Sequence, residues 1–274
     1  DQMIRHGIYE ERNQILPKLQ AGVRFFAIAA SLASYFLVGV NQRLPIITAG
    51  CISIGAGIVA LLFGQDNYGR VKGNNIFRML QLQAKSFIKE EKLLLLSLRT
   101  IVCHVPFVAF VLFWQIYATE VIHIETKYLA FFLLVFMVLL MLGNYAVSIF
   151  TRKISNLGTS IAGIIISILG FVLLFVLPSF PGFVMGAGLI EFGFGVEQSA
   201  TSTWMCDCIE SETRSAYSSI FSTIQSVAGF IIMNLLGVLT EWNGVNAAWC
   251  VAAVAMGVDI VILVIFSRKY RNRV

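Results

Sequence analysis

Eight runs of predominantly apolar residues, each about 20 residues long, follow one another along the chain and restrict what it can fold into. A helix of that length crosses a hydrocarbon core of ~30 Å and satisfies its own backbone hydrogen bonds there. Only 13% of the residues are charged, about half the share of a soluble domain. We therefore expect an all-α polytopic membrane protein with eight transmembrane helices. Their approximate bounds are 22–40, 44–63, 99–120, 129–150, 157–177, 182–205, 215–239 and 245–266.

The basic residues predict how these helices are oriented. If the eight spans alternate in direction, all but two of the 20 Lys and Arg residues fall on one side of the membrane, and only Arg43 and Lys127 fall on the other. The positive-inside rule makes the basic side, with both ends of the chain, cytoplasmic. The same asymmetry explains the net charge of +5 without nucleic-acid binding, which we do not expect.

The longest hydrophilic stretch, residues 64–98, divides the chain into three parts. Residues 1–63 hold two spans and residues 99–274 hold six. In the connector between them, Ile76, Leu80, Phe87 and Leu94 recur at roughly helical spacing among basic residues. This pattern favours an amphipathic helix on the inner membrane surface, serving as a linker or as a regulatory, lipid-binding element.

Two carboxylates interrupt the sixth span, in the segment GLIEFGFGVEQSATSTW at residues 188–204. At 1.5 Å per residue, Glu191 lies roughly 13 Å and Glu197 roughly 22 Å from the outer end. A charge at such depth is costly unless it meets water, a proton or a partner. Glu191 shares a helix face with Gln198, whereas Glu197 lies on another face. Asp259, in the last span, has a depth similar to that of Glu197, which permits contact between them.

Two explanations remain open for these acids. They could bind protons or a cationic substrate along a transport pathway, or they could be paired with basic groups elsewhere in the bundle. Amide side chains within the spans could line the same pathway or bond neighbouring helices. The predicted pathway residues are Glu191, Glu197, Gln198, Asp259, Gln115, Asn144, Gln225 and Asn234.

Other motifs indicate packing rather than chemistry. Gly182 and Gly186 form a GxxxG pattern, and the same span continues with Gly193 and Gly195, which predicts close helix contact. The five cysteines lie mostly in apolar segments and lack the spacing of a zinc site. Because no catalytic motif, phosphate-binding loop or metal pair occurs, we expect no enzyme activity, no cofactor and no metal.

The arrangement of two helices, a long basic connector and six more helices resembles the major facilitator superfamily of transporters, which have six helices, a linker and six helices. The first 45 residues, ending in Arg43-Leu-Pro, resemble the entry into the fifth helix of drug-efflux-like members. The segment CIESETRSAYSSIFSTIQSVAGFIIMNLLGVL, from Cys208, resembles the junction of the tenth and eleventh helices. The resemblance implies a partial fold, helices 5–12 of the pattern, which upstream helices of the same protein would complete.

The resemblance, with the acids, implies a secondary transporter that works by alternating access. Proton-coupled efflux of amphipathic or cationic compounds is the function we expect, with a small-molecule substrate, protons and the lipid bilayer as partners. The plasma membrane is the expected location. The alternatives are a non-transporting receptor or assembly subunit with a transporter fold, and an intramembrane enzyme acting on lipid.

Overall fold

A computed structural model of the chain describes residues 11–41, 43–63, 86–151, 153–209 and 213–270. Eight long α-helices account for most of these described residues, and none of these residues forms a strand. The helices are α2 (Arg12–Val40), α3 (Leu44–Phe63), α5 (Glu91–Ile116), α6 (Leu129–Phe150), α7 (Asn156–Val176), α8 (Phe180–Cys208), α9 (Arg214–Asn243) and α10 (Asn246–Tyr270). A π-helical turn, Tyr117–Val121, extends α5, and a 3-10 turn, Thr126–Tyr128, precedes α6.

Local sequence sets several of the helix ends. Ser155 and Ser179 cap α7 and α8, because each hydroxyl accepts a hydrogen bond from the backbone N–H three residues later. Helix α9 ends at Gly244, whose φ of 75° is a conformation that favours glycine. These caps separate helices that would otherwise run together in an almost continuous apolar sequence.

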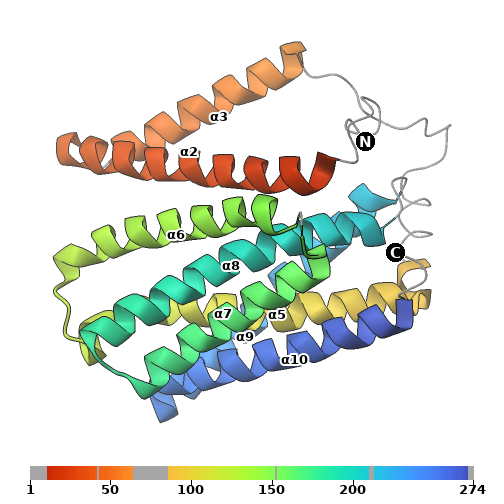
Figure 1. Cartoon of the computed structure of the whole chain (residues 1–274). Coiled ribbons are helices and arrows are strands. Elements are labelled where there is room, and N and C mark those ends of the chain that lie inside the picture. Colours follow the sequence, from red (N-terminus) through yellow and green to blue (C-terminus); the bar gives the residue numbers. More distant parts are fainter. Residues whose placement is uncertain (1–10, 42, 64–85, 152, 210–212, 271–274) are drawn as a thin grey trace.

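Six helices, α5 to α10, form one packed group. Helix α8 packs against α6 and α7, and α10 packs against α5 and α7 (Figure 1). Their contact surfaces hold a continuous core rich in aromatic side chains, in which Phe110, Phe171, Phe183 and Trp249 are almost completely buried. Because lipid is as apolar as these side chains, they stabilise the group through van der Waals packing and aromatic contacts.

The first two helices are attached differently. Helix α2 lies along α6, and α3 packs mainly against α2. Most apolar side chains of α3 are exposed, among them Ile46, Leu61 and Leu62. The pair α2–α3 therefore contacts the six-helix group through α2.

Glycines bring α8 close to both of its neighbours. A Cβ atom on Gly163 of α7 would lie 2.7 Å from the backbone nitrogen of Glu197, and one on Gly193 of α8 would lie 2.7 Å from the Gly163 carbonyl oxygen. A Cβ atom on Gly143 of α6 would lie 2.2 Å from the Phe192 carbonyl oxygen. Only residues without a side chain permit these approaches, so the packing role predicted for the glycines of α8 is confirmed.

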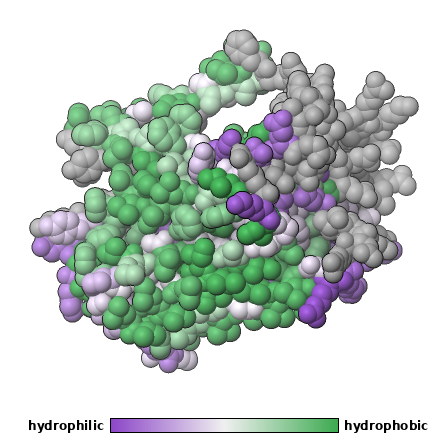
Figure 2. Space-filling view, in the orientation of Figure 1, coloured by the Kyte–Doolittle hydropathy of each residue, from purple (hydrophilic) through white to green (hydrophobic). Residues whose placement is uncertain are grey.

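Apolar residues cover the middle of the molecule in Figure 2, and hydrophilic residues gather toward the ends of the helices. Among the described residues, six helices are long and apolar enough to cross a membrane, namely α3, α5 with its π turn, α6, α7, α9 and α10. The other two have 29 residues each, which is long enough to cross, but they carry more polar residues. In α8 these include Glu191, Glu197 and Gln198.

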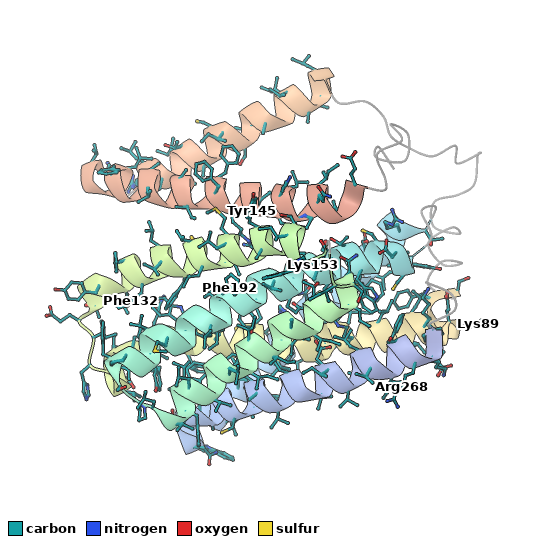
Figure 3. All side chains as sticks on the ribbon, viewed as in Figure 1. Lys89, Phe132, Tyr145, Lys153, Phe192 and Arg268 are labelled. Atoms are coloured by element: carbon teal, nitrogen blue, oxygen red, sulfur yellow. The ribbon has the colours of Figure 1, made fainter. Side chains whose placement is uncertain are left out.

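Basic residues mark one end of the bundle. Lys89, Lys153 and Arg268 lie at the same end, and Phe132 lies toward the opposite end (Figure 3). At the basic end, Lys269 of α10 forms an ion pair with Glu91 of α5. The helices thus alternate as the distribution of Lys and Arg predicts.

Two predicted boundaries differ from the structure by more than four residues. Helix α5 begins at Glu91 rather than at residue 99, and α2 begins at Arg12 rather than at residue 22. In α5, the apolar run Leu93–Leu96 continues the helix, and Leu93 and Leu96 are buried against the core. Arg99 therefore lies about two turns inside α5 and not at its first residue. The amphipathic helix predicted from residue 76 onward falls largely in 64–85, outside the described residues.

Candidate functional site

Arg99 of α5 lies between two carboxylates that come from different helices. Its Nη2 donates a hydrogen bond of 2.5 Å to Glu197 Oε1 on α8 and one of 3.4 Å to Asp259 Oδ2 on α10. Its Nε lies 3.1 Å from Asp259 Oδ1, close enough for an ion pair but without the alignment of a hydrogen bond. Arg99 and Asp259 are 2% and 1% exposed. Three helices are thus joined by buried charges.

Hydroxyl groups extend this cluster to a fourth helix. Thr201 Oγ1 lies one turn beyond Glu197 on α8, donates to Glu197 Oε1 at 2.7 Å, and accepts from Arg99 Nη2 at 2.9 Å. Ser160 Oγ on α7 lies 2.9 Å from Thr201 Oγ1. Gly163, on the next turn of α7, allows α8 to approach closely enough for this bond. The ring of Trp204 lies 5.7 Å from the Arg99 guanidinium carbon, within the range of a cation–π contact.

The cluster lies well inside the bundle. At 1.5 Å per residue, Arg99 is roughly 12 Å from the start of α5, and Glu197 and Asp259 are each roughly 16 Å from the end of their helices at the same side. Removal of one charged side chain from such a buried group leaves its partner without a compensating charge, which is strongly unfavourable. The similar depth predicted for Glu197 and Asp259 is confirmed, and Arg99 bridges them. We define Arg99, Glu197, Asp259, Thr201 and Ser160 as the ion cluster.

Glu191 lies on a different face of α8, as its spacing from Glu197 predicts. Its side chain is partly exposed, and within the described part of the chain it makes no hydrogen bond or ion pair. Arg24 of α2 donates a hydrogen bond of 3.2 Å to Gln198 Oε1 and acts electrostatically on Glu191. Glu191 and Gln198 therefore face α2, whereas Glu197 faces α5 and α10. The two acids of α8 belong to two separate sites.

The predicted amides are dispersed. Gln115 is exposed near the end of α5, and Asn234 is exposed on α9, where it donates to the Phe230 carbonyl oxygen of its own helix. Asn144 is buried in α6, and its Nδ2 has no hydrogen-bond partner among the described residues. Gln225 Nε2 of α9 forms a hydrogen bond of 3.0 Å with His104 Nδ1 of α5. These four side chains do not converge with the acids on one point.

A cavity of about 210 Å³ lies between the end of α8 and the start of α9. Its lining residues are Ser202, Met205, Cys206, Ile209, Arg214, Ser218 and Phe221. None of the predicted pathway residues is among them. The acids of α8 therefore do not line this cavity.

Sequence analysis did not single out Arg99, Thr201 or Ser160. The predicted span begins at residue 99, which places Arg99 beside the basic connector, although the apolar run before it and the apolar residues after it are typical of a helix interior. Two intramembrane acids that need a positive partner are a second signal for it. Thr201 and Ser160 carried no such signal, because hydroxyl groups are common in membrane helices.

This architecture, a bundle of apolar helices with buried charges linking them, defines a polytopic helical membrane protein. The family model of the Major Facilitator Superfamily matches residues 10–233, most of the chain. The chain therefore belongs to the Major Facilitator Superfamily, a family of secondary transporters that bind small molecules within the lipid bilayer. The family consists of transporters, which is compatible with the expected lack of enzyme activity. No individual curated protein matches the chain.

Proposed function

We propose that this chain carries out proton-coupled efflux of amphipathic or cationic compounds by alternating access. The observation that carries the proposal is the separation of two intramembrane acids on one helix. Glu191 faces α2, a helix of the first pair, whereas Glu197 is bonded within the six-helix group. An acid at a boundary between two groups of helices can gain and lose a proton or a cation as that boundary opens.

Transport in sealed vesicles tests this proposal. The purified protein is reconstituted, and efflux of an amphipathic cationic dye is followed with and without a pH gradient. We expect the gradient to drive dye movement, and Glu191→Gln to abolish that dependence while leaving the protein folded. Glu197→Gln should also weaken coupling. Glu241→Gln, an exposed acid at the end of α9, is the matched control and should behave like the unchanged protein.

Dye movement that ignores the pH gradient in every variant would contradict proton coupling. The alternative function, a non-transporting receptor or assembly subunit, would then gain support. It predicts that Glu191→Gln has no effect and that a folded partner protein binds the connector, residues 64–98.

The two-helix pair supports a further part of the proposal. The division into 1–63, 64–98 and 99–274 corresponds to part of one helical bundle, a connector and a second bundle, and upstream helices would complete the first. The exposed apolar side chains of α3 are consistent with additional helices on that surface. An intact mass of the native protein close to 30.3 kDa would contradict this.

We place the basic end of the helices, and both ends of the chain, in the cytoplasm, and the protein in the plasma membrane. The basic residues support this orientation by the positive-inside rule. Protease protection of a tag fused after Val274, in intact and in permeabilised cells, tests it. Cleavage of the tag in intact cells would reverse the orientation.

A further inference from the structure

The cavity between the end of α8 and the start of α9 is lined by hydrogen-bond donors that the protein leaves unused. Arg214 of α9 donates through Nη2 to the Cys206 and Ile209 carbonyl oxygens, at 2.8 and 3.2 Å. Its Nε is buried and has no hydrogen-bond partner among the described residues. Ser202 of α8 and Ser218 of α9 line the same cavity, and neither hydroxyl group forms a hydrogen bond within the described part of the chain. Because a buried donor without a partner is costly, the acceptors for this site come from outside the protein.

Charge selects the kind of ligand. Arg214 lies in the first turn of α9, where the helix dipole is positive and the first backbone N–H groups have no partner within the helix. That turn contains no acidic residue, and the side chain of Thr213 makes no capping hydrogen bond. Lys92 of α5, which donates to the Cys208 carbonyl oxygen at 2.6 Å, adds a second positive charge at the end of α8. Among the described residues no acid lines the cavity, and Asp207 of α8 is not part of the lining. The ligand is therefore an anion with several acceptor oxygens, as in a phosphate group.

The apolar part of the lining and the place of the cavity in the bundle favour a lipid as the source of that phosphate. Met205, Ile209 and Phe221 complete the wall. The cavity lies at the end of the bundle that carries Lys153 and Arg268 (Figure 3). Basic pockets between transmembrane helices at such an end bind phospholipid headgroups. The volume of about 210 Å³ is below the ~300–1,000 Å³ that encloses a whole small molecule. It therefore fits a headgroup whose acyl chains remain in the bilayer.

We propose that this cavity binds the phosphate group of an anionic phospholipid from the leaflet at the basic end of the helices. Arg214 Nε and the hydroxyl groups of Ser202 and Ser218 donate to the phosphate oxygens, and the apolar wall contacts the glycerol and the first carbons of the acyl chains. Binding is non-covalent. The site goes beyond the proposed function and does not depend on transport, because it shares no residue with the ion cluster or with Glu191.

Residues 86–89 of the connector pack against the same cavity wall. Phe87 is 4% exposed, and its ring centroid lies 5.3 Å from that of Phe221 and 5.5 Å from that of Tyr217. Phe221 therefore contacts the connector and also lines the cavity. Next to Phe87, the side chains of Ile88 and Lys89 are exposed, and an apolar and a basic side chain together favour contact with an anionic membrane surface. A lipid in the cavity would hold this part of the connector against α9.

Native mass spectrometry of the purified protein tests the inference, with phosphatidic acid, phosphatidylcholine of the same acyl chains and inorganic phosphate as probes. We expect the unchanged protein to bind phosphatidic acid about tenfold more tightly than phosphatidylcholine, whose choline group offsets the phosphate charge. Arg214→Gln should abolish this preference, and Ser218→Ala should reduce it about threefold, because one hydrogen bond is lost. Arg268→Gln and Ser222→Ala, at exposed positions outside the cavity, are the matched controls and should retain it.

Arg214 also bonds the end of α8, so the double variant Ser202→Ala/Ser218→Ala decides the outcome if Arg214→Gln does not fold. Three results would overturn the inference. They are equal binding of the two lipids by the unchanged protein, a preference for phosphatidic acid that the double variant retains in full, and displacement of bound phosphatidic acid by inorganic phosphate. The last result would make the cavity a site for a soluble anion.

Discussion

Helices α3 and α8 contain several glycines each, yet they occupy opposite positions in the molecule. Among the described residues, no atom would lie within 4 Å of a Cβ placed on Gly50, Gly55 or Gly57 of α3. None of the described side chains of α3 is buried within the protein. Helix α8, which is less apolar, is enclosed by α6 and α7 at its glycines. Apolar composition therefore indicates compatibility with lipid, whereas small residues beside polar ones mark the helix at the centre of the bundle.

The largest effect should come from the ion cluster of the six-helix group. Arg99→Gln leaves two buried acids without their guanidinium, and loss of one partner from a buried ion pair costs about 3–5 kcal/mol. We expect a large fall in the unfolding temperature and in the yield of monodisperse protein. Arg43→Gln, in the exposed turn between α2 and α3, should have no effect. Equal stability of the two variants would show that Arg99 does not hold the helices together.

The glycines of the two regions should differ next. A Cβ on Gly195 would lie 2.2 Å from the Leu140 carbonyl oxygen, and overpacking of this kind costs about 1–3 kcal/mol. Gly195→Ala should therefore lower the unfolding temperature. Gly55→Ala should leave it unchanged or raise it, since alanine is the better helix former. If Gly55→Ala is instead the more damaging substitution, α3 has a close partner helix.

A smaller effect should follow from removal of one hydroxyl group. Tyr117, in the π turn that extends α5, donates a 2.6 Å hydrogen bond to the Leu174 carbonyl oxygen of α7 and is 0% exposed. Tyr117→Phe should destabilise the protein by about 0.5–1.5 kcal/mol, measured by thermal unfolding. Tyr145→Phe, at an exposed position of α6, is the matched control. No difference between them would mean that the bond is not formed in the membrane.

The smallest effect should come from the contact between α2 and α8. The Arg24–Gln198 hydrogen bond is only partly buried, and we expect a coupling energy of about 0.5–1 kcal/mol. A double-mutant cycle with Arg24→Gln and Gln198→Ala measures this energy. A coupling energy as large as that within the ion cluster would show that α2 is fixed to the six-helix group and is not a separable part.

The existence of the helices could be predicted because each apolar run carries its own signal. The presence of acids within α8 and α10 could be read in the same way. Their partner could not, since Arg99 is separated from Glu197 by 98 residues and from Asp259 by 160. Arg99 also follows a series of basic connector residues, which concealed its position inside α5. Which helix faces which is decided by contacts between distant segments.

The close contact between α7 and α8 has a consequence for any opening of the bundle. Along Gly163, Gly170, Gly186 and Gly193, backbone lies against backbone, with few side chains between the two helices whose rotamers could change. Two surfaces of this kind slide or travel together more readily than they hinge apart. Helices α7 and α8 are therefore expected to move as one unit. A passage should open at the borders of this unit, where Arg99 of α5 and Arg24 of α2 bond to α8.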